Sequence, residues 1–230
     1  MTPLILLPGM MCDARLFEAQ IAALGTERDV TVAGIDRHNT VAELAQDVLD
    51  TAPPKFALAG LSMGGIVAME VLRQAPDRVE RIALMDTNPL AETELVRQRR
   101  SPQMAAAREG RLAEVMRDEM KPHYLADGPQ KPAILDLCME MAQNLGPDVF
   151  IRQSEALMTR PDQSETLRRA NLPALILCGR HDRVCPLERH TLMADLIAGA
   201  VLKVIEDAGH LPTLEQPQAT TRELENWLRA

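Results

Sequence analysis

The sequence predicts an α/β protein with a mostly parallel, six-stranded sheet, helices on both faces and an all-helical insertion. Short runs rich in Ile, Leu, Val and Ala alternate with segments of helical apolar spacing. Such runs are typical of strands buried on both faces of a parallel sheet. The alternation stops in the middle of the chain, where charged and apolar residues follow helical spacing only. We therefore expect a core formed by residues 1–90 and 172–230, with a helical cap over 91–171.

The first part of the chain predicts four strands, each a short apolar run that ends at a turn. Asp13 is a typical helix N-cap residue. Pro53-Pro54 ends a later helix, because proline disfavours helical backbone in the residue before it. We expect strands over residues 4–7, 29–35, 56–61 and 79–85, and helices over 14–24, 41–51 and 63–74.

The rest of the chain predicts two more strands, separated from the first four by the insertion. Within the insertion, proline and glycine mark the ends of helices, notably at Pro102 and at Gly146-Pro147. We expect insertion helices over residues 92–100, 102–120, 131–144 and 147–158. We expect the last strands over 174–178 and 200–205, and core helices over 186–197 and 215–228.

Composition excludes several classes of function. The formal net charge is -8 and the basic residues are scattered along the chain, so we expect no nucleic-acid partner. No apolar run is long enough to span a membrane. Residues 1–8 lack a basic leader and a cleavage site, so we expect no signal peptide. The 4 cysteines show no metal-binding spacing, which favours buried thiols in a reducing cytoplasm.

The stretch 55–70 contains the motif Gly60-Leu-Ser62-Met-Gly64 between an apolar run and a helix. A serine on a tight strand-to-helix turn has its hydroxyl exposed at the end of the sheet, and the flanking glycines avoid collisions within the turn. The helix that follows directs its N-terminal N–H groups at the same point. We therefore predict that Ser62 is a nucleophile, although the motif alone also occurs as an ordinary turn.

Two further residues complete a predicted catalytic triad. Asp182 follows the fifth expected strand and His210 follows the sixth, and a serine needs a histidine base that a carboxylate orients. The order Ser62, Asp182, His210 is the one expected for this motif. Asp86, after the fourth strand, is an alternative acid, and His181 is an alternative base that adjoins the acid. The other histidines lie in polar turns or helices: His38, His123 and His190.

An oxyanion hole needs two N–H donors near the nucleophile. The residue after the nucleophile, Met63, supplies one. The other should come from the loop after the first strand, where we favour Met10, with Met11 as the alternative. Only the backbone acts in this role, so the type of side chain matters little.

Four stretches resemble the landmark motifs of the α/β-hydrolase superfamily, in particular its small branch of helical-capped serine hydrolases. They are Leu6–Met10, Gly60–Gly65, Gly179–Asp182 and Ala208–Pro212. The resemblance implies a sheet that lacks the family's usual first two strands and has the first strand here between the second and third. The family usually has His-Gly where this chain has Pro8-Gly9. A serine nucleophile argues against dehalogenase or epoxide hydrolase chemistry.

These observations predict a carboxylic ester hydrolase that cleaves a small, mainly uncharged ester or acyl substrate without a metal or organic cofactor. Two alternatives stay open: a C–C bond hydrolase or lyase on the same triad, and a ligand-binding receptor of the same fold. Arg160 could bring a cation to a carboxylate-bearing substrate, whereas a surface ion pair is its commoner role. The stretch Arg97–Arg100 indicates a solvated helix face.

Overall fold

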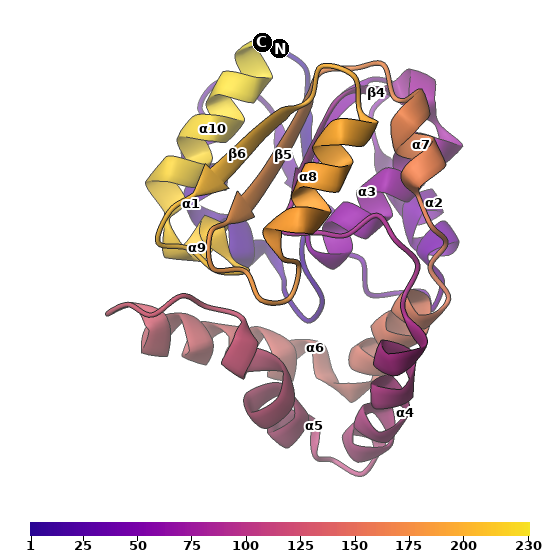
Figure 1. The fold of residues 1–230 in the computed structure, drawn as a ribbon, viewed down its shortest axis with the longest axis vertical. Helices are drawn as coiled ribbons and strands as arrows, with labels where there is room; N and C mark the ends of the chain where they lie inside the picture. The colour runs from indigo at the N-terminus through magenta and orange to yellow at the C-terminus, as the bar shows by residue number, and fades with distance from the viewer.

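A computed structural model describes residues 1–230 and contains one six-stranded sheet (Figure 1). Every neighbouring pair of strands is parallel, and β1 lies between β2 and β3, as expected. The strand order is β2-β1-β3-β4-β5-β6. The bounds are β1 Leu4–Leu7, β2 Val30–Val32, β3 Phe56–Leu61, β4 Val79–Met85, β5 Ala174–Gly179 and β6 Val201–Ile205.

The central strands are buried on both faces, and their alternating side chains enter two separate cores. Leu4 and Leu6 of β1 pack into one core, while Ile5 and Leu7 pack into the other. This follows from the two-residue period of a strand. The expected strand over 29–35 is wrong in length, because only three of its residues pair with β1 at the edge of the sheet.

Helices cover both faces of the sheet (Figure 1). One face carries α1 (Glu18–Leu24), α9 (Pro212–Glu215) and α10 (Pro217–Arg229), and the other carries α2 (Val41–Thr51), α3 (Met63–Gln74) and α8 (Leu187–Leu196). Before α1, Asp13 caps a 3₁₀ turn over Ala14–Phe17, its carboxylate accepting a hydrogen bond from the Arg15 N–H. The expected α/β class with helices on both faces is therefore confirmed.

The segment between β4 and β5 contains helices and no strand. It contains α4 (Glu94–Arg108), α5 (Leu112–Glu114), a π-helical turn (Val115–Met120), a 3₁₀ turn (Lys121–His123), α6 (Lys131–Met158) and α7 (Ser164–Arg169). Figure 1 shows α4, α5 and α6 together below the ends of β5 and β6, with both chain termini at the opposite end of the molecule. Helix α7 instead packs against α3 and α8.

Two helix boundaries of this segment test the proline and glycine signals. The expected break at Pro102 is wrong: α4 continues through it. Pro102 is exposed, so water can bond the carbonyl that loses its helical N–H partner. The break at Gly146-Pro147 is a kink inside α6, where Gly146 has a φ of 80°. No helix in the chain has both the length and the apolar character needed to cross a membrane.

Candidate active site

Ser62 lies between β3 and α3 in a strained backbone conformation, with φ 54° and ψ -116°. The surrounding turn leaves no room for side chains. A Cβ on Gly60 would lie 2.2 Å from the Gly64 carbonyl oxygen, and a Cβ on Gly64 would lie 2.1 Å from the Leu7 carbonyl oxygen. Such distances are far inside van der Waals contact, so only glycine fits at either position. The turn therefore holds the start of α3 directly against the end of β1.

His210 forms hydrogen bonds with both other residues of the predicted triad. Its Nε2 lies 2.9 Å from Ser62 Oγ, and its Nδ1 lies 2.9 Å from Asp182 Oδ2. The other oxygen of Asp182 accepts hydrogen bonds from the N–H groups of Val184 and Cys185, at 2.8 and 2.9 Å. The carboxylate is therefore fixed in place while it faces the imidazole.

The ionisation of Asp182 depends on its partners. Burial by itself raises the pKa of this carboxyl, but the neighbouring His210 and the two N–H donors outweigh burial and lower the pKa below its usual value. A carboxylate at this place keeps the Nδ1 of His210 protonated and leaves Nε2 free to accept the Ser62 proton.

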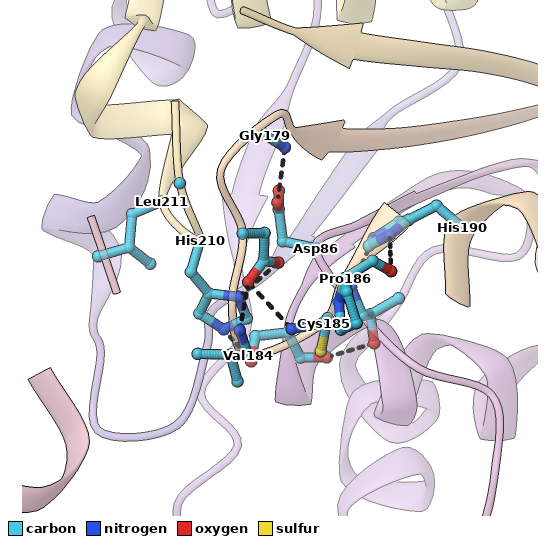
Figure 2. A network of polar contacts seen from close by, with 12 residues as sticks. Asp86, Gly179, Val184, Cys185, Pro186, His190, His210 and Leu211 are labelled. Atoms are coloured by element: carbon cyan, nitrogen blue, oxygen red, sulfur yellow. Dashed lines mark hydrogen bonds and ion pairs between the residues drawn. The ribbon is translucent and has the colours of Figure 1, made fainter. Parts of the chain in front are cut away.

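Asp86, the alternative acid, is fully buried but bonds elsewhere. Its Oδ1 accepts a hydrogen bond from the Gly179 N–H at 2.9 Å, and its Oδ2 has no partner (Figure 2). Burial raises the pKa of Asp86 well above its usual value, and the charge of Asp182 raises it further. The geometry thus brings Asp182, and not Asp86, to His210.

The loop that carries His210 is held by residues that the sequence analysis missed. Glu215, at the end of α9, accepts hydrogen bonds from the N–H groups of Gly209, Leu211 and Ala126. The Tyr124 carbonyl accepts the His210 N–H at 2.6 Å, and the Tyr124 ring lies 5.5 Å from the imidazole between centroids. Nothing in the sequence distinguishes Glu215 from the many exposed glutamates, because its partners are found only in three dimensions.

The loop after β1 approaches the nucleophile as expected for an oxyanion hole. A Cβ on Gly9 would lie 3.5 Å from the Ser62 Cβ. The Met10 N–H has no hydrogen-bond acceptor in the protein, and Met63, the first residue of α3, has no helical acceptor for its N–H. The Met11 N–H is occupied, since it donates to Gln153 Oε1 of α6 at 2.9 Å. Of the two expected donors in this loop, only Met10 has a free N–H.

The other histidines lie outside this arrangement. His190 is buried in α8, where its Nε2 accepts the Thr87 N–H at 3.1 Å and its Nδ1 faces the Pro186 carbonyl (Figure 2). Burial lowers the pKa of His190 to about 4. His38 forms an exposed pair with Asp47. The His181 side chain lines a cavity of about 230 Å³ at the surface. His123 is exposed.

One group of residues has the composition of a metal site. The ligand atoms of Asp182, Cys185 and His210 lie within 4.8 Å of one another. A metal there would displace the hydrogen bond between His210 and Asp182, and it would need the thiolate form of Cys185. Burial raises the pKa of that thiol well above its usual value. The donor atoms are therefore better suited to their present hydrogen bonds than to a metal.

The arginines of the helical segment differ from the expectation. Arg100 is not on a solvated helix face: its side chain is 12% exposed and is paired with the buried Glu92. Arg160 pairs with the same carboxylate, and its side chain is 10% exposed, so its ion pair is not a surface one. Both ion pairs form on Glu92, which precedes α4, and helical periodicity alone did not predict this convergence.

Comparison with known proteins places the chain in a family. A model of the alpha/beta hydrolase family matches residues 4–223, so the chain belongs to this family, as expected. The chain is 26% identical to a pimeloyl-acyl-carrier-protein methyl ester esterase of Klebsiella pneumoniae, over 94% of the chain and 89% of that protein. It is 29% identical to a 2-succinyl-6-hydroxy-2,4-cyclohexadiene-1-carboxylate synthase of Serratia proteamaculans, over 76% and 68%. The structure of a thermophilic esterase from Thermogutta terrifontis is similar, with a TM-score of 0.91, 27% identity and coverage of 100% of this chain and 90% of that one.

Proposed function

We propose that the protein is a serine hydrolase that cleaves a small ester through an acyl-enzyme. The observation that carries this proposal is the continuous chain of hydrogen bonds Ser62–His210–Asp182, with 2.9 Å at each step. A hydroxyl bonded to a histidine that is itself bonded to a carboxylate is the arrangement needed to activate a weak nucleophile. Membership of the alpha/beta hydrolase family, and an esterase among the relatives, support the same reaction.

The first half of the reaction forms the acyl-enzyme. Ser62 Oγ attacks the ester carbonyl carbon while His210 Nε2 takes its proton, and Asp182 stabilises the imidazolium. The carbonyl oxygen becomes an oxyanion, which accepts hydrogen bonds from the Met10 and Met63 N–H groups. His210 then gives the proton to the leaving alcohol oxygen as the ester C–O bond breaks.

The second half releases the acid. A water molecule gives a proton to His210 and attacks the acyl-enzyme carbonyl, and the Met10 and Met63 N–H groups again bind the oxyanion. The proton returns to Ser62 Oγ as the acyl bond breaks, so the enzyme is restored. No step requires a metal or an organic cofactor. We further propose that the helices within residues 91–171 act as a cap that bounds the substrate, and that the enzyme acts in the cytoplasm.

A C–C hydrolase or lyase on the same triad is the second candidate, because a relative is named as a synthase. The test is steady-state hydrolysis of p-nitrophenyl esters of increasing acyl length, by the native protein and by Ser62→Ala. We expect clear turnover that is lost in Ser62→Ala. If native turnover is no faster than that of Ser62→Ala, ester hydrolysis is the wrong reaction. Carbon acids with a nearby carbonyl would then test the lyase, and ligand-dependent stabilisation without turnover would indicate a receptor.

A further inference from the structure

Three arginines of the helical segment, Arg97, Arg100 and Arg160, form what we call the arginine cluster. Arg100 donates its Nε and Nη2 to the two oxygens of Glu92, at 2.6 and 2.7 Å. Arg160 donates its Nη1 to the same carboxylate at 3.2 Å and its Nε to the Leu90 carbonyl at 3.0 Å. The Glu92 side chain is only 2% exposed. One buried carboxylate therefore accepts hydrogen bonds from two guanidinium groups.

Arg97 adds a third charge without a partner. It lies one turn before Arg100 on α4, its Nε is buried without a hydrogen-bond acceptor, and its side chain forms no ion pair. Burial lowers the pKa of Arg160, the Glu92 carboxylate raises it, and the charges of Arg100 and Arg97 lower it further. Arg100 and Arg160 meet on one carboxylate, and Arg97 lies one turn before Arg100 on the same helix, so Glu92 is the one acidic side chain paired with these three arginines.

The arginine cluster borders the proposed reaction centre. Arg100 Nη1 lies 3.8 Å from Met10 Sδ, on the loop whose N–H faces the nucleophile. Burial raises the pKa of Tyr124, whose ring packs against His210, and the charge of Arg100 partly offsets that rise. Burial likewise raises the pKa of Cys185, whose N–H holds Asp182, and the charge of Arg160 partly offsets it. Figure 1 shows α4, the helix of Arg97 and Arg100, in the helical segment below the sheet.

Arg97 is half-buried, and a charge that is partly withdrawn from water is stabilised by an opposite charge nearby. The planar fork of a guanidinium group matches a carboxylate with two parallel hydrogen bonds. We propose that the arginine cluster is a binding subsite for a carboxylate of the substrate. The preferred substrate is then an ester that carries a second, ionised carboxylate, such as a half-ester of a short dicarboxylic acid. This inference rests on the proposed ester hydrolysis and replaces the expectation of a mainly uncharged substrate.

The test compares two substrates of similar length that differ in charge. One is mono-p-nitrophenyl glutarate, which carries a free carboxylate, and the other is p-nitrophenyl pentanoate, which is neutral. Because a hydrogen bond to a charged group contributes about 1.5–3 kcal/mol, we expect kcat/KM to favour the glutarate ester by about tenfold or more. In Arg97→Gln this ratio should fall by about fivefold or more, with the change mainly in KM for the anionic ester.

Arg99→Gln is the matched control, since it removes the same charge from the same helix. Arg99 is exposed and forms no hydrogen bond or ion pair, so its variant should keep the native ratio. The subsite is disproved if the native ratio is one or less, or if the Arg97 and Arg99 variants have equal ratios. Arg97 holds no partner in the fold, so its variant should remain folded, which circular dichroism checks.

Failure of the subsite and failure of ester hydrolysis have different signatures. If neutral esters are hydrolysed with dependence on Ser62 but no anion is preferred, hydrolysis stands and the subsite is wrong. If neither ester is hydrolysed, binding of glutarate to the Ser62→Ala protein, measured by calorimetry, tests the subsite alone. Binding that Arg97→Gln weakens and Arg99→Gln does not would support it, and absence of binding would overturn it.

Discussion

The loops at the end of the sheet and the helical segment beside them differ in how fully their polar groups are hydrogen-bonded. In the loops, Asp182 uses both oxygens, and Glu215 accepts three backbone N–H groups around His210. In the helical segment, Arg97 has a buried Nε with no acceptor, and Glu92 is shared between two arginines. The loops therefore fix the orientation of Asp182 and His210, while the helical segment leaves the Arg97 Nε without an acceptor.

Asp86 is the exception within the loops, since one of its oxygens is buried without a partner. It has a positive φ of 44° at the end of β4 and lies close enough to Asp182 for the two carboxyls to influence each other. Burial and the charge of Asp182 raise the pKa of Asp86, whereas His210 and two N–H donors lower the pKa of Asp182. The pKa values of two neighbouring buried carboxyl groups thus shift in opposite directions because their partners differ.

The largest expected effect is the difference in kcat between variants of Asp182 and Asp86. Asp182→Asn should lower kcat for an ester by about 10⁴-fold, because the amide no longer fixes the tautomer of His210. Asp86→Asn should lower kcat far less, because Asn can still accept the Gly179 N–H and resembles the neutral acid. Steady-state kinetics on both variants measures the difference. Equal losses would mean that Asp86 also acts directly on the histidine.

The next effect concerns the close contact between the start of α3 and the end of β1. Gly64→Ala would push a methyl group into the Leu7 carbonyl, 2.1 Å away. We expect a loss of about 3 kcal/mol of unfolding free energy, which lowers the melting temperature by about 6–12 °C. Gly128→Ala in the helical segment is the control, because its nearest atom is 4.0 Å away. A stable Gly64→Ala protein would show that β1 and α3 can move apart.

The third effect is acid sensitivity of the fold through His190 of α8, which accepts a hydrogen bond from the loop after β4. The unfolded chain binds a proton on this histidine near pH 6.5, and the folded protein does so only near pH 4. The folded state therefore loses stability as the pH falls from about 6.5 to 4, by about 3 kcal/mol in total. In His190→Gln, whose amide oxygen can accept the Thr87 N–H, that loss should be absent.

Urea unfolding at pH 7.5 and pH 4.5 measures this effect as the difference between native and variant proteins. His123→Gln is the control, because His123 is exposed and should leave the pH dependence unchanged. An unchanged pH dependence in His190→Gln would show that another group causes the acid sensitivity.

The smallest effect links the two regions through Gln153. Its Oε1 accepts the Met11 N–H and its Nε2 donates to the Ile35 carbonyl, each at 2.9 Å. Gln153→Leu should cost about 2 kcal/mol, because it leaves two buried backbone groups unpaired, and kcat should fall as the adjoining Met10 loop shifts. Thermal unfolding and kinetics measure both changes. Gln143→Leu, exposed on the same helix, should change stability by less than about 0.5 kcal/mol, and an equal effect of both variants would remove the special role of Gln153.

The ranges of β3, α3 and β4 agree with the sequence prediction, because apolar periodicity and glycine position are local signals. The order of Ser62, Asp182 and His210 along the chain likewise located the candidate triad at strand ends. The sequence pattern gave wrong bounds for elements whose length depends on exposure to solvent or on strand pairing. Pro102 stays within α4 because its surroundings are exposed, and β2 is short because it pairs on one side only.

The sequence by itself determined the fold class and the strand-to-helix turn at Ser62, since both depend on patterns of residues close together in the chain. It also gave the chain order of the candidate triad, because each member directly follows a strand that such a pattern predicts. Only the tertiary structure decided which acid faces His210, which of Met10 and Met11 has a free N–H, and that Arg100 and Arg160 converge on Glu92. These contacts join distant elements. A side chain's role there depends on burial and on its partners, which neither composition nor spacing records.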